Sequence, residues 1–342
     1  MHIYFSGIGG TGIGPLAMIA QQAGFSVSGS DKQDSEYFRH LKQCGITNIH
    51  IGQDLEQIKG VHEAQPIDWL VYSSAVPIEN PDAPELQFCR DNNIKATRRD
   101  DFMNFVLDNG KLKLIGIAGT HGKTTTTAMT VWLAQQVGMK ASHLLPAKTS
   151  FAEMGDYKQD SEYFILECDE FDRTFLSYKP YVSLISGVDY DHPDIYSTRS
   201  DYQQAFRDYI NQSGHTILWQ MDSTALQVTP SDSVTVLPDN ESSLNELRLF
   251  GLVNRRDAWL VIQAINRLTQ HPISDLIAHM NKFPGISRRF EKITDHVYSD
   301  YAHTPEKIRG AIQMAHEIAD NNVVVIYEGL HNTRQHFIKE DL

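Results

Sequence analysis

The sequence predicts an α/β protein in which mostly parallel sheets are covered by helices. Short apolar runs that fit buried strands alternate with longer segments that fit helices, over almost all of the 342 residues. Glycine-rich turns follow two of these strands directly, at 7–12 and 116–122, and each turn leads into a helix. This alternation is typical of doubly wound sheets.

The first domain is expected to span residues 1–108. Its strands are expected at 2–6, 25–29, 47–51 and 68–73, and its helices from the glycine turn to Ala23, at 34–44 and at 102–108. Asn109-Gly110 is read as a turn that ends the domain. The pattern predicts a Rossmann-like fold for this part of the chain.

The second domain is expected to span residues 109–292. Its strands are expected at 113–118, 163–167, 181–186 and 215–219, and its helices at 123–137, 199–212, 254–268 and 273–281. Residues 222–248 are rich in Ser, Asp and Pro, so we expect a loop there with one short strand. The sheet of this domain is predicted to be mostly parallel.

Residues 293–342 offer a strand at 296–301, a helix at 305–319 and an apolar strand at 321–328. Two strands and one helix are too few for an independent sheet domain. We therefore expect the truncated start of a third, Rossmann-like domain.

Composition narrows the class of protein. The formal net charge of −13 argues against a general binder of nucleic acid or anionic membranes. Cys44, Cys89 and Cys168 show no metal or disulfide spacing, which indicates a reducing compartment. The N-terminus lacks the pattern of a signal peptide, and no apolar run is long enough to span a bilayer. We expect a cytoplasmic protein that is a monomer or a homodimer.

The strongest motif is GIAGTHGKTTTT, which starts at Gly116. Glycines let the backbone wrap around phosphates, and free amides at a helix start point at the anion. Lys123 is expected to reach the β- and γ-phosphates of ATP, and Thr124 to hold Mg²⁺. The alternative is a glycine turn before a helix that happens to contain Lys-Thr.

A second glycine motif, GIGGTG, starts at Gly7 after the first strand, and Asp31 follows the second strand. This has the form of a dinucleotide-binding fingerprint. NAD is one candidate ligand, and a UDP-linked substrate needs the same pyrophosphate cradle. A tight turn without a ligand is the alternative.

Two acidic segments follow strands of the second domain. Glu167, Asp169, Glu170 and Asp172 lie in ECDEFD, where carboxylates at a strand end are well placed for Mg²⁺. His192 lies among carboxylates in DYDHPD and could bind a second metal ion or orient a substrate. A solvated acidic loop and a structural histidine are the alternatives.

The order of motifs resembles the Mur ligases, the ATP-dependent amino-acid ligases of peptidoglycan precursor synthesis. The matching segments are the glycine-rich first turn, GTHGKTTTT, ECDEFD, DYDHPD, the GxxNxxDA pattern at 251–258, RRFE and DYAHTP. Within the family, the resemblance is greatest to the branch that joins L-alanine to UDP-N-acetylmuramate. The branch that recycles a murein tripeptide shares many of the same segments.

The resemblance implies a UDP-substrate domain, an ATP domain and a third domain that helps bind the amino acid. Implied ATP contacts are Gly119, Thr120, His121, Gly122, Lys123, Thr124, Thr125, Asn254, Asp257, Arg289 and Asp300. Implied UDP-substrate contacts are Gly9, Gly10, Thr11, Gly12, Asp31, Ser73 and His121. Lys123, Glu167 and His192 are the implied catalytic residues, and Thr124, Glu167 and His192 the implied Mg²⁺ ligands.

The chain departs from the family pattern at several positions. Gly187 stands where the family usually has Asn, and Val253 where it has His. Leu330 and His331 stand where basic residues are common. These departures bear on adenine contacts and substrate choice. A nucleotide-binding module without ligase activity and an NAD-dependent oxidoreductase are the alternatives from other classes.

Overall fold

The computed structural model describes residues 1–73, 75–319 and 322–329. The chain divides into two compact units. The first contains residues 1–113, 140–146 and 153–164, and the second contains 114–139, 147–152 and the residues from 165 onward. The three-domain division predicted from the sequence stays a prediction. Within the described residues, no helix is long and apolar enough to cross a bilayer.

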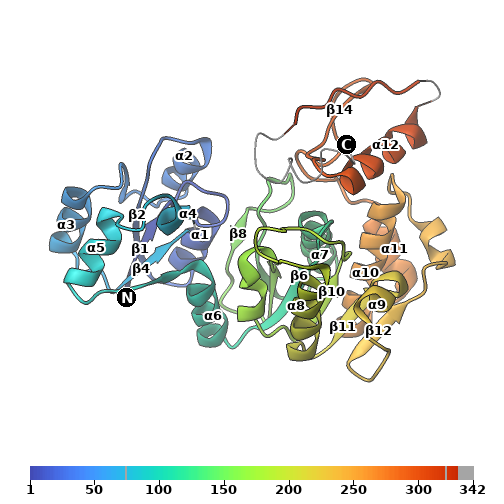
Figure 1. Ribbon diagram of the computed structural model, residues 1–342, viewed down its shortest axis with the longest axis horizontal. Helices are drawn as coiled ribbons and strands as arrows, with labels where there is room; N and C mark the ends of the chain where they lie inside the picture. The colour runs from blue at the N-terminus through green and yellow to red at the C-terminus, as the bar shows by residue number, and fades with distance from the viewer. Residues whose placement is uncertain (74, 320–321, 330–342) are drawn as a thin grey trace. The chain divides into compact units, whose positions relative to one another are not determined.

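The first unit contains a five-stranded parallel sheet with the order β3-β2-β1-β4-β5. Its strands are β1 (His2–Ser6), β2 (Ser26–Asp31), β3 (Ile49–Ile51), β4 (Trp69–Tyr72) and β5 (Lys95–Arg98). Its helices are α1 (Gly14–Gln22), α2 (Glu36–Gln43), α3 (Leu55–Ala64), α4 (Ala75–Glu79), α5 (Pro84–Asp91) and α6 (Arg99–Gly110). Figure 1 shows these helices around the sheet, as the Rossmann-like prediction requires.

Strand β1 is fully buried, so its apolar run could be recognised without any alternation. A buried carboxylate sits at the end of the sheet where the glycine turn begins. Glu85 is 1% exposed and accepts hydrogen bonds from the hydroxyls of Tyr4, Ser6 and Ser30. Burial raises the pKa of Glu85. These three hydroxyls take the place of water around this buried carboxyl group.

The second sheet has seven strands in the order β12-β11-β10-β6-β9-β7-β8. Its strands are β6 (Lys113–Ala118), β7 (Ala141–Leu144), β8 (Gly155–Asp156), β9 (Tyr163–Glu167), β10 (Val182–Ile185), β11 (Thr216–Trp219) and β12 (Val234–Leu237). Strands β6, β10, β11 and β12 run parallel, and β7 pairs antiparallel with β8. The prediction of a mostly parallel sheet is confirmed.

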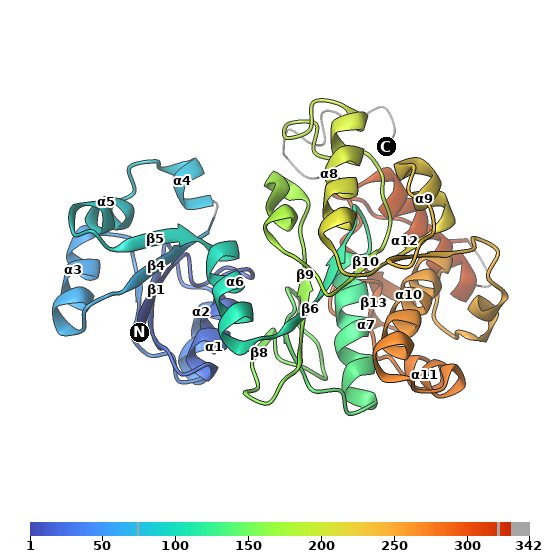
Figure 2. The same ribbon diagram turned by 90° about the horizontal axis from the view of Figure 1, so that it is seen from below.

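Helices cover this sheet and extend beyond it. They are α7 (Lys123–Gln136), α8 (Arg199–Gln212), α9 (Gln220–Leu226), α10 (Leu252–Thr269) and α11 (Ile273–Met280), with 3₁₀ turns η1 (Phe171–Ser177) and η2 (Ser242–Glu246). A hairpin of β13 (Glu291–Thr294) and β14 (Val297–Ser299) precedes α12 (Pro305–Ile318). Figure 2 shows α7 and α10 side by side, and the two helices pack against each other.

Several sequence predictions were wrong or incomplete. Residues 222–248 were expected to be a loop with one strand, but they also contain most of α9 and η2. The turn expected at Asn109-Gly110 lies inside α6, which ends at a left-handed Lys111. Helices α3, α4 and α5 and strands β5, β7, β8 and β13 were not predicted. These elements are short, and short segments give weak periodic signals.

The strand expected at 321–328 is absent from residues 322–328, the part of it that the structure describes. Val324 and Ile326 are exposed there, at 85% and 95%. A strand forms only where a neighbour completes its backbone hydrogen bonds, and an apolar run alone supplies no neighbour.

Candidate active site

The second glycine loop joins β6 to α7, and its backbone requires glycine at two positions. Gly119 has φ +146°, and a side chain there would lie 3.0 Å from the carbonyl oxygen of Gly187. Gly122 has φ +73°, and a Cβ atom there would lie 2.7 Å from Asp257 Oδ2. The loop therefore folds tightly against its neighbours, as a phosphate-binding loop does before its helix.

Lys123, the first residue of α7, is held by an acidic partner. Its Nζ donates to Glu170 Oε2 at 2.6 Å and to the carbonyl oxygen of Gly119 at 2.8 Å. Burial alone would lower the pKa of Lys123, but the charges of Glu170 and Asp169 raise it overall. Burial likewise works to raise the pKa of Glu170, yet the Lys123 ammonium brings it down to about 2. The pair is therefore charged on both sides.

Glu167 ends β9 and accepts a hydrogen bond from the Thr124 hydroxyl at 2.9 Å. Burial raises the pKa of Glu167. Among the described residues, no acid, histidine or cysteine cluster of three or more members could hold a metal ion. Mg²⁺ commonly uses one or two carboxylates together with phosphate oxygens and water. The half-buried side-chain oxygens of Glu167 and Thr124 fit such a shared site.

His121 and His192 are engaged by different carboxylates. His121 Nε2 lies 2.8 Å from Asp189 Oδ2, and this hydrogen bond lowers the pKa of Asp189. His192 has a left-handed backbone, with φ +56°, and its Nε2 lies 3.5 Å from Glu170 Oε1. Glu170 thus lies between Lys123 and His192, so two of the predicted catalytic residues contact the same carboxylate.

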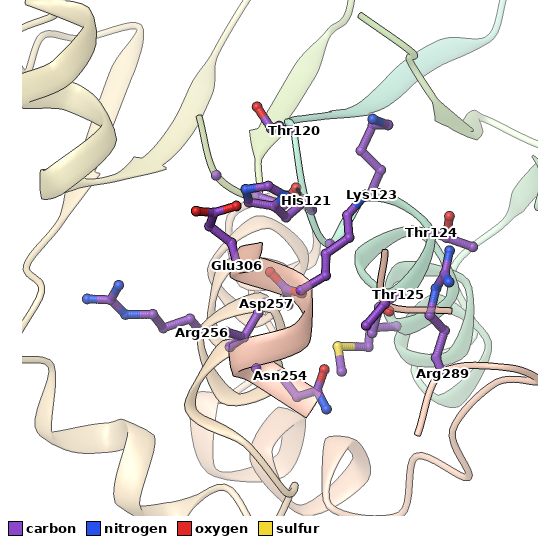
Figure 3. Close-up of a pocket in the computed structure, with 18 of the residues that line it drawn as sticks. Thr120, His121, Lys123, Thr124, Thr125, Asn254, Arg256, Asp257, Arg289 and Glu306 are labelled. Atoms are coloured by element: carbon purple, nitrogen blue, oxygen red, sulfur yellow. Dashed lines mark hydrogen bonds between the residues drawn. The ribbon is translucent and has the colours of Figure 1, made fainter. Parts of the chain in front are cut away.

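These residues line one cavity of about 870 Å³ in the second unit. This volume is within the range of small-molecule sites. The predicted site residues that line it are Thr120, His121, Gly122, Lys123, Thr124, Thr125, Glu167, His192, Asn254, Asp257, Arg289 and Asp300. Gly119 precedes this set and does not line the cavity. Figure 3 shows side chains from the loop, α10 and α12 around the same space.

One end of the cavity is formed by α10 and α12. Asn254 donates to the carbonyl oxygen of Phe250 at 2.9 Å and to the sulfur of Met314 at 3.1 Å. Asp257 is 1% exposed, and burial raises its pKa well above the usual value. Among the residues that the structure describes, its Oδ2 has no hydrogen-bond partner.

Arg289 and Asp300 come from the segment around the hairpin. Asp300 Oδ2 accepts from the Phe290 amide at 2.7 Å, and burial raises the pKa of Asp300. The guanidinium of Arg289 lies 5.2 Å from the centre of the Tyr301 ring. Leu330 and His331, named among the departures from the family pattern, lie outside the described residues.

The predicted UDP-substrate residues in the first unit gather where β1, β2 and β4 end. The Gly9 amide donates to Asp31 Oδ2 at 2.7 Å, and a Cβ atom on Gly9 would lie 2.9 Å from the same oxygen. A side chain on Gly12 would collide with the Arg99 guanidinium, and one on Gly7 would contact Ser73 at 3.5 Å. Gly10 and Thr11 lie between these positions. His121, the remaining residue assigned to this set, lines the cavity of the second unit.

Sequence reasoning missed several residues of the second cavity. Glu170 was considered only as one of several carboxylates near Mg²⁺, and Asp189 received no role, although each pairs with a predicted site residue. Arg256, Glu306 and Lys307 also line the cavity and were not predicted. The pattern DYAHTP marks a turn before a helix, and it does not show which side chains of that helix face the cavity.

Two family models match the sequence. They are the Mur ligase family catalytic domain, over residues 2–109, and the Mur ligase middle domain, over residues 117–246. A UDP-N-acetylmuramate–L-alanine ligase from Clostridium novyi is 30% identical over 95% of this chain and 76% of its own length. The chain belongs to the Mur ligase family. The predicted resemblance is thereby confirmed. The middle domain of Mur ligases binds ATP, and the glycine loop, Glu167 and His192 lie within the matched segment, while the cavity extends beyond it to residues 248–314.

Other relatives of this Mur ligase agree with that result. A UDP-N-acetylmuramate–L-alanine ligase from Salinispora arenicola is 29% identical over 95% of the chain and 69% of its own length. The crystal structure of UDP-N-acetylmuramate-alanine ligase from Thermotoga maritima matches with a TM-score of 0.80 at 24% identity, covering 94% of this chain and 79% of that one. A murein peptide ligase from Psychrobacter arcticus matches with a TM-score of 0.72 at 24% identity, covering 97% and 81%. The two structures support the fold.

Proposed function

We propose that this Mur ligase joins L-alanine to the lactyl carboxylate of UDP-N-acetylmuramate, at the expense of ATP. The observation that carries the proposal is the cavity in which Lys123, Thr124, Glu167 and His192 meet. The named relatives at 26–30% identity support the choice of substrates. Nucleotide substrates of this kind are made in the cytoplasm, where we expect the protein to act.

The proposed division of labour follows the three predicted domains. Residues 1–108 bind the UDP-sugar through Gly9, Gly10, Thr11, Gly12, Asp31 and Ser73, with His121 on the sugar side. Residues 109–292 bind ATP through the loop, and residues 293–342 begin the domain that helps bind the amino acid. Asn254 and Asp257 serve the adenine, Arg289 the phosphates and Asp300 the ribose.

The first proposed step is phosphoryl transfer. A carboxylate oxygen attacks the γ-phosphorus of ATP, the bond from γ-phosphorus to the bridging oxygen breaks, and ADP leaves with that electron pair. Lys123 neutralises charge on the transferring group, and amides of residues 119–123 orient it. Thr124 and Glu167 would hold one Mg²⁺ with the phosphates, His192 would help hold a second, and these ions would supply further neutralisation.

The second proposed step is amide formation. The neutral amine of L-alanine attacks the acyl carbon, inorganic phosphate leaves with the electron pair of the broken carbon–oxygen bond, and the nitrogen loses one proton to solvent. Catalysis in both steps is mainly positioning, because ATP already supplies the leaving group. The paired charges of Glu170 and Lys123 fix the position of the ammonium group before the reaction begins.

The test is an assay of the purified chain with ATP, Mg²⁺ and UDP-N-acetylmuramate. L-Alanine and the murein tripeptide are supplied in separate reactions, and phosphate release and product mass are measured. We expect an amide product with L-alanine. Preference for the tripeptide would assign the chain to the recycling branch. Nucleotide binding without an amide product would support a nucleotide-binding module that has no ligase activity. Binding of NADH would support an oxidoreductase.

A further inference from the structure

Lys307, in the first turn of α12, lines the same cavity as Lys123 and Arg289. Its neighbour in the sequence, Glu306, pairs with Arg309 at 3.2 Å and so is engaged elsewhere. Within residues 1–73, 75–319 and 322–329, no carboxylate lies within 4 Å of the Lys307 ammonium. Lys123, by contrast, has Glu170 at 2.6 Å.

The environment of Lys307 disfavours its charge. Burial, followed by the positive charges of Lys123 and Arg289, lowers the pKa of Lys307 to about 8, although Glu170 and Glu167 act in the opposite direction. A desolvated cation near two other cations is costly unless an anion arrives to compensate it. The cavity of a nucleotide-binding domain provides such an anion.

The position of Lys307 along α12 shows which part of a nucleotide it would meet. Lys307, Gly310, Ala311 and Met314 all line the cavity, and their spacing places them on one face of the helix. Met314 contacts Asn254, at the end formed by α10. Seven residues of helix separate Met314 from Lys307 by about 10 Å. Lys307 therefore lies toward the other end, where Lys123, Glu167 and Glu170 act on its charge.

We infer that Lys307 binds the phosphoryl group that is transferred, first as the γ-phosphate of the nucleoside triphosphate and then as the phosphate of the acyl phosphate. Lys307 then approaches the group from α12, while Lys123 approaches it from α7. This inference rests on the proposed function, because it assigns a residue to the γ-phosphate that the reaction consumes. Lys307 is a ligand that sequence motifs did not mark.

The test compares two nucleotides by calorimetric titration of the purified chain with Mg²⁺. One is ADP, and the other is the β,γ-methylene analogue of ATP, which carries a γ-phosphate that cannot be transferred. Lys307→Met is expected to lower the affinity for the analogue about tenfold or more, since a charge-assisted hydrogen bond is lost. Its affinity for ADP should stay within about twofold.

Matched variants separate this effect from a general loss of charge. Lys292→Met removes an exposed lysine that pairs with Asp295 at 2.7 Å, and it should bind both nucleotides as the wild type does. Lys307→Arg keeps the charge and should retain most of the preference for the analogue. If Lys307→Met fails to give a folded protein in a thermal melt, Lys307→Gln takes its place.

The outcomes distinguish this inference from the proposed function. If Lys307→Met lowers the affinities for ADP and for the analogue equally, or lowers neither, the role of Lys307 would be overturned. A wild-type chain that binds the analogue but makes no amide product would refute the proposed ligation and leave this inference standing. A wild-type chain that binds neither nucleotide would refute both the ATP site and the role of Lys307.

Discussion

The two glycine-rich loops begin alike and differ in the charges around them. Each follows a buried parallel strand and leads into a helix, α1 in the first unit and α7 in the second. In the first loop the Gly9 amide is bound by the carboxylate of Asp31. In the second, the helix opens with Lys123, and Arg289 and Lys307 line the same cavity.

This difference indicates that the glycines determine the backbone shape of each loop, whereas the charged side chains around the loop determine which ligand it binds. The first loop, in which the Gly9 amide binds Asp31, suits a nucleotide whose ribose hydroxyls can also bond to that carboxylate. The second loop, whose cavity contains Lys123, Arg289 and Lys307, suits the longer polyphosphate of a nucleoside triphosphate. The proposed assignment of UDP-sugar to the first unit and ATP to the second follows this contrast in charge.

The largest expected effect comes from removing the cation of the second loop. Lys123→Met should lower ATP-dependent product formation about a thousandfold, because the developing charge on the phosphoryl group loses its nearest neutralising group. Phosphate release in the full reaction measures this effect. Lys140→Met, at an exposed pair with Asp160, is the control and should react normally. Turnover within tenfold of the wild type would refute the phosphate-loop assignment.

A second test asks whether each loop binds a different ligand, and it uses one substitution in each loop. Gly119→Ala places a Cβ atom against the backbone of Gly187, so affinity for the ATP analogue should fall about tenfold to a hundredfold. UDP-N-acetylmuramate should still bind to this variant. Gly9→Ala crowds Asp31 and should give the reverse pattern. Both affinities are measured by calorimetry.

Gly60→Ala is the matched control for these two variants, because nothing lies within 4 Å of its added Cβ atom. It should bind both ligands normally. Loss of both ligands in either loop variant, with the fold intact by circular dichroism, would mean that the loops do not divide the two ligands between them.

The smallest expected effect concerns a negative charge in the second cavity. Burial raises the pKa of Asp222 to about 6, and its Oδ1 accepts from the Val188 amide at 2.8 Å. Because the folded pKa exceeds the unfolded one, ionisation costs the folded state about 2–3 kcal/mol above pH 6 and nothing below about pH 4. Asp222→Asn keeps the acceptor and should raise the free energy of unfolding by about 2 kcal/mol at pH 8.

Urea denaturation at pH 8 and pH 4 measures this difference. The charged groups that act on Asp222 are Asp189, Arg256 and Asp239, and all three remain in the variant. Asp295→Asn, at an 85% exposed side chain, is the control and should change little at either pH. An equal gain at both pH values would mean that the charge of Asp222 is not its cause.

The sequence was most informative where strands are buried and helices are long. The segments 2–6, 113–118, 163–167 and 199–212 match the observed bounds, because an uninterrupted apolar run or a full helical stripe is a strong local signal. The hairpin strand β13 could not be predicted in this way. Its side chains are mostly exposed, so no apolar pattern marks it.

The candidate site could be predicted only as far as motifs reach. Residues of the loop and of ECDEFD come together because parallel strands end at the same edge of a sheet. The link from Lys123 through Glu170 to His192 could not be predicted, since it depends on side-chain directions after three different strands. Lys307 was missed for a similar reason, because only the packing of α12 turns it toward the cavity.

The ion pair between Lys123 and Glu170 has a consequence for how ATP is held. A nucleotide that recruits the Lys123 ammonium must compete with a carboxylate that already binds it at 2.6 Å. Binding is therefore an exchange of partners, and its free energy is the difference between two strong contacts. Such a site discriminates against weak anions such as chloride, which cannot match the carboxylate. It also returns the lysine to its own glutamate when phosphate departs, so product release does not leave a buried charge uncompensated.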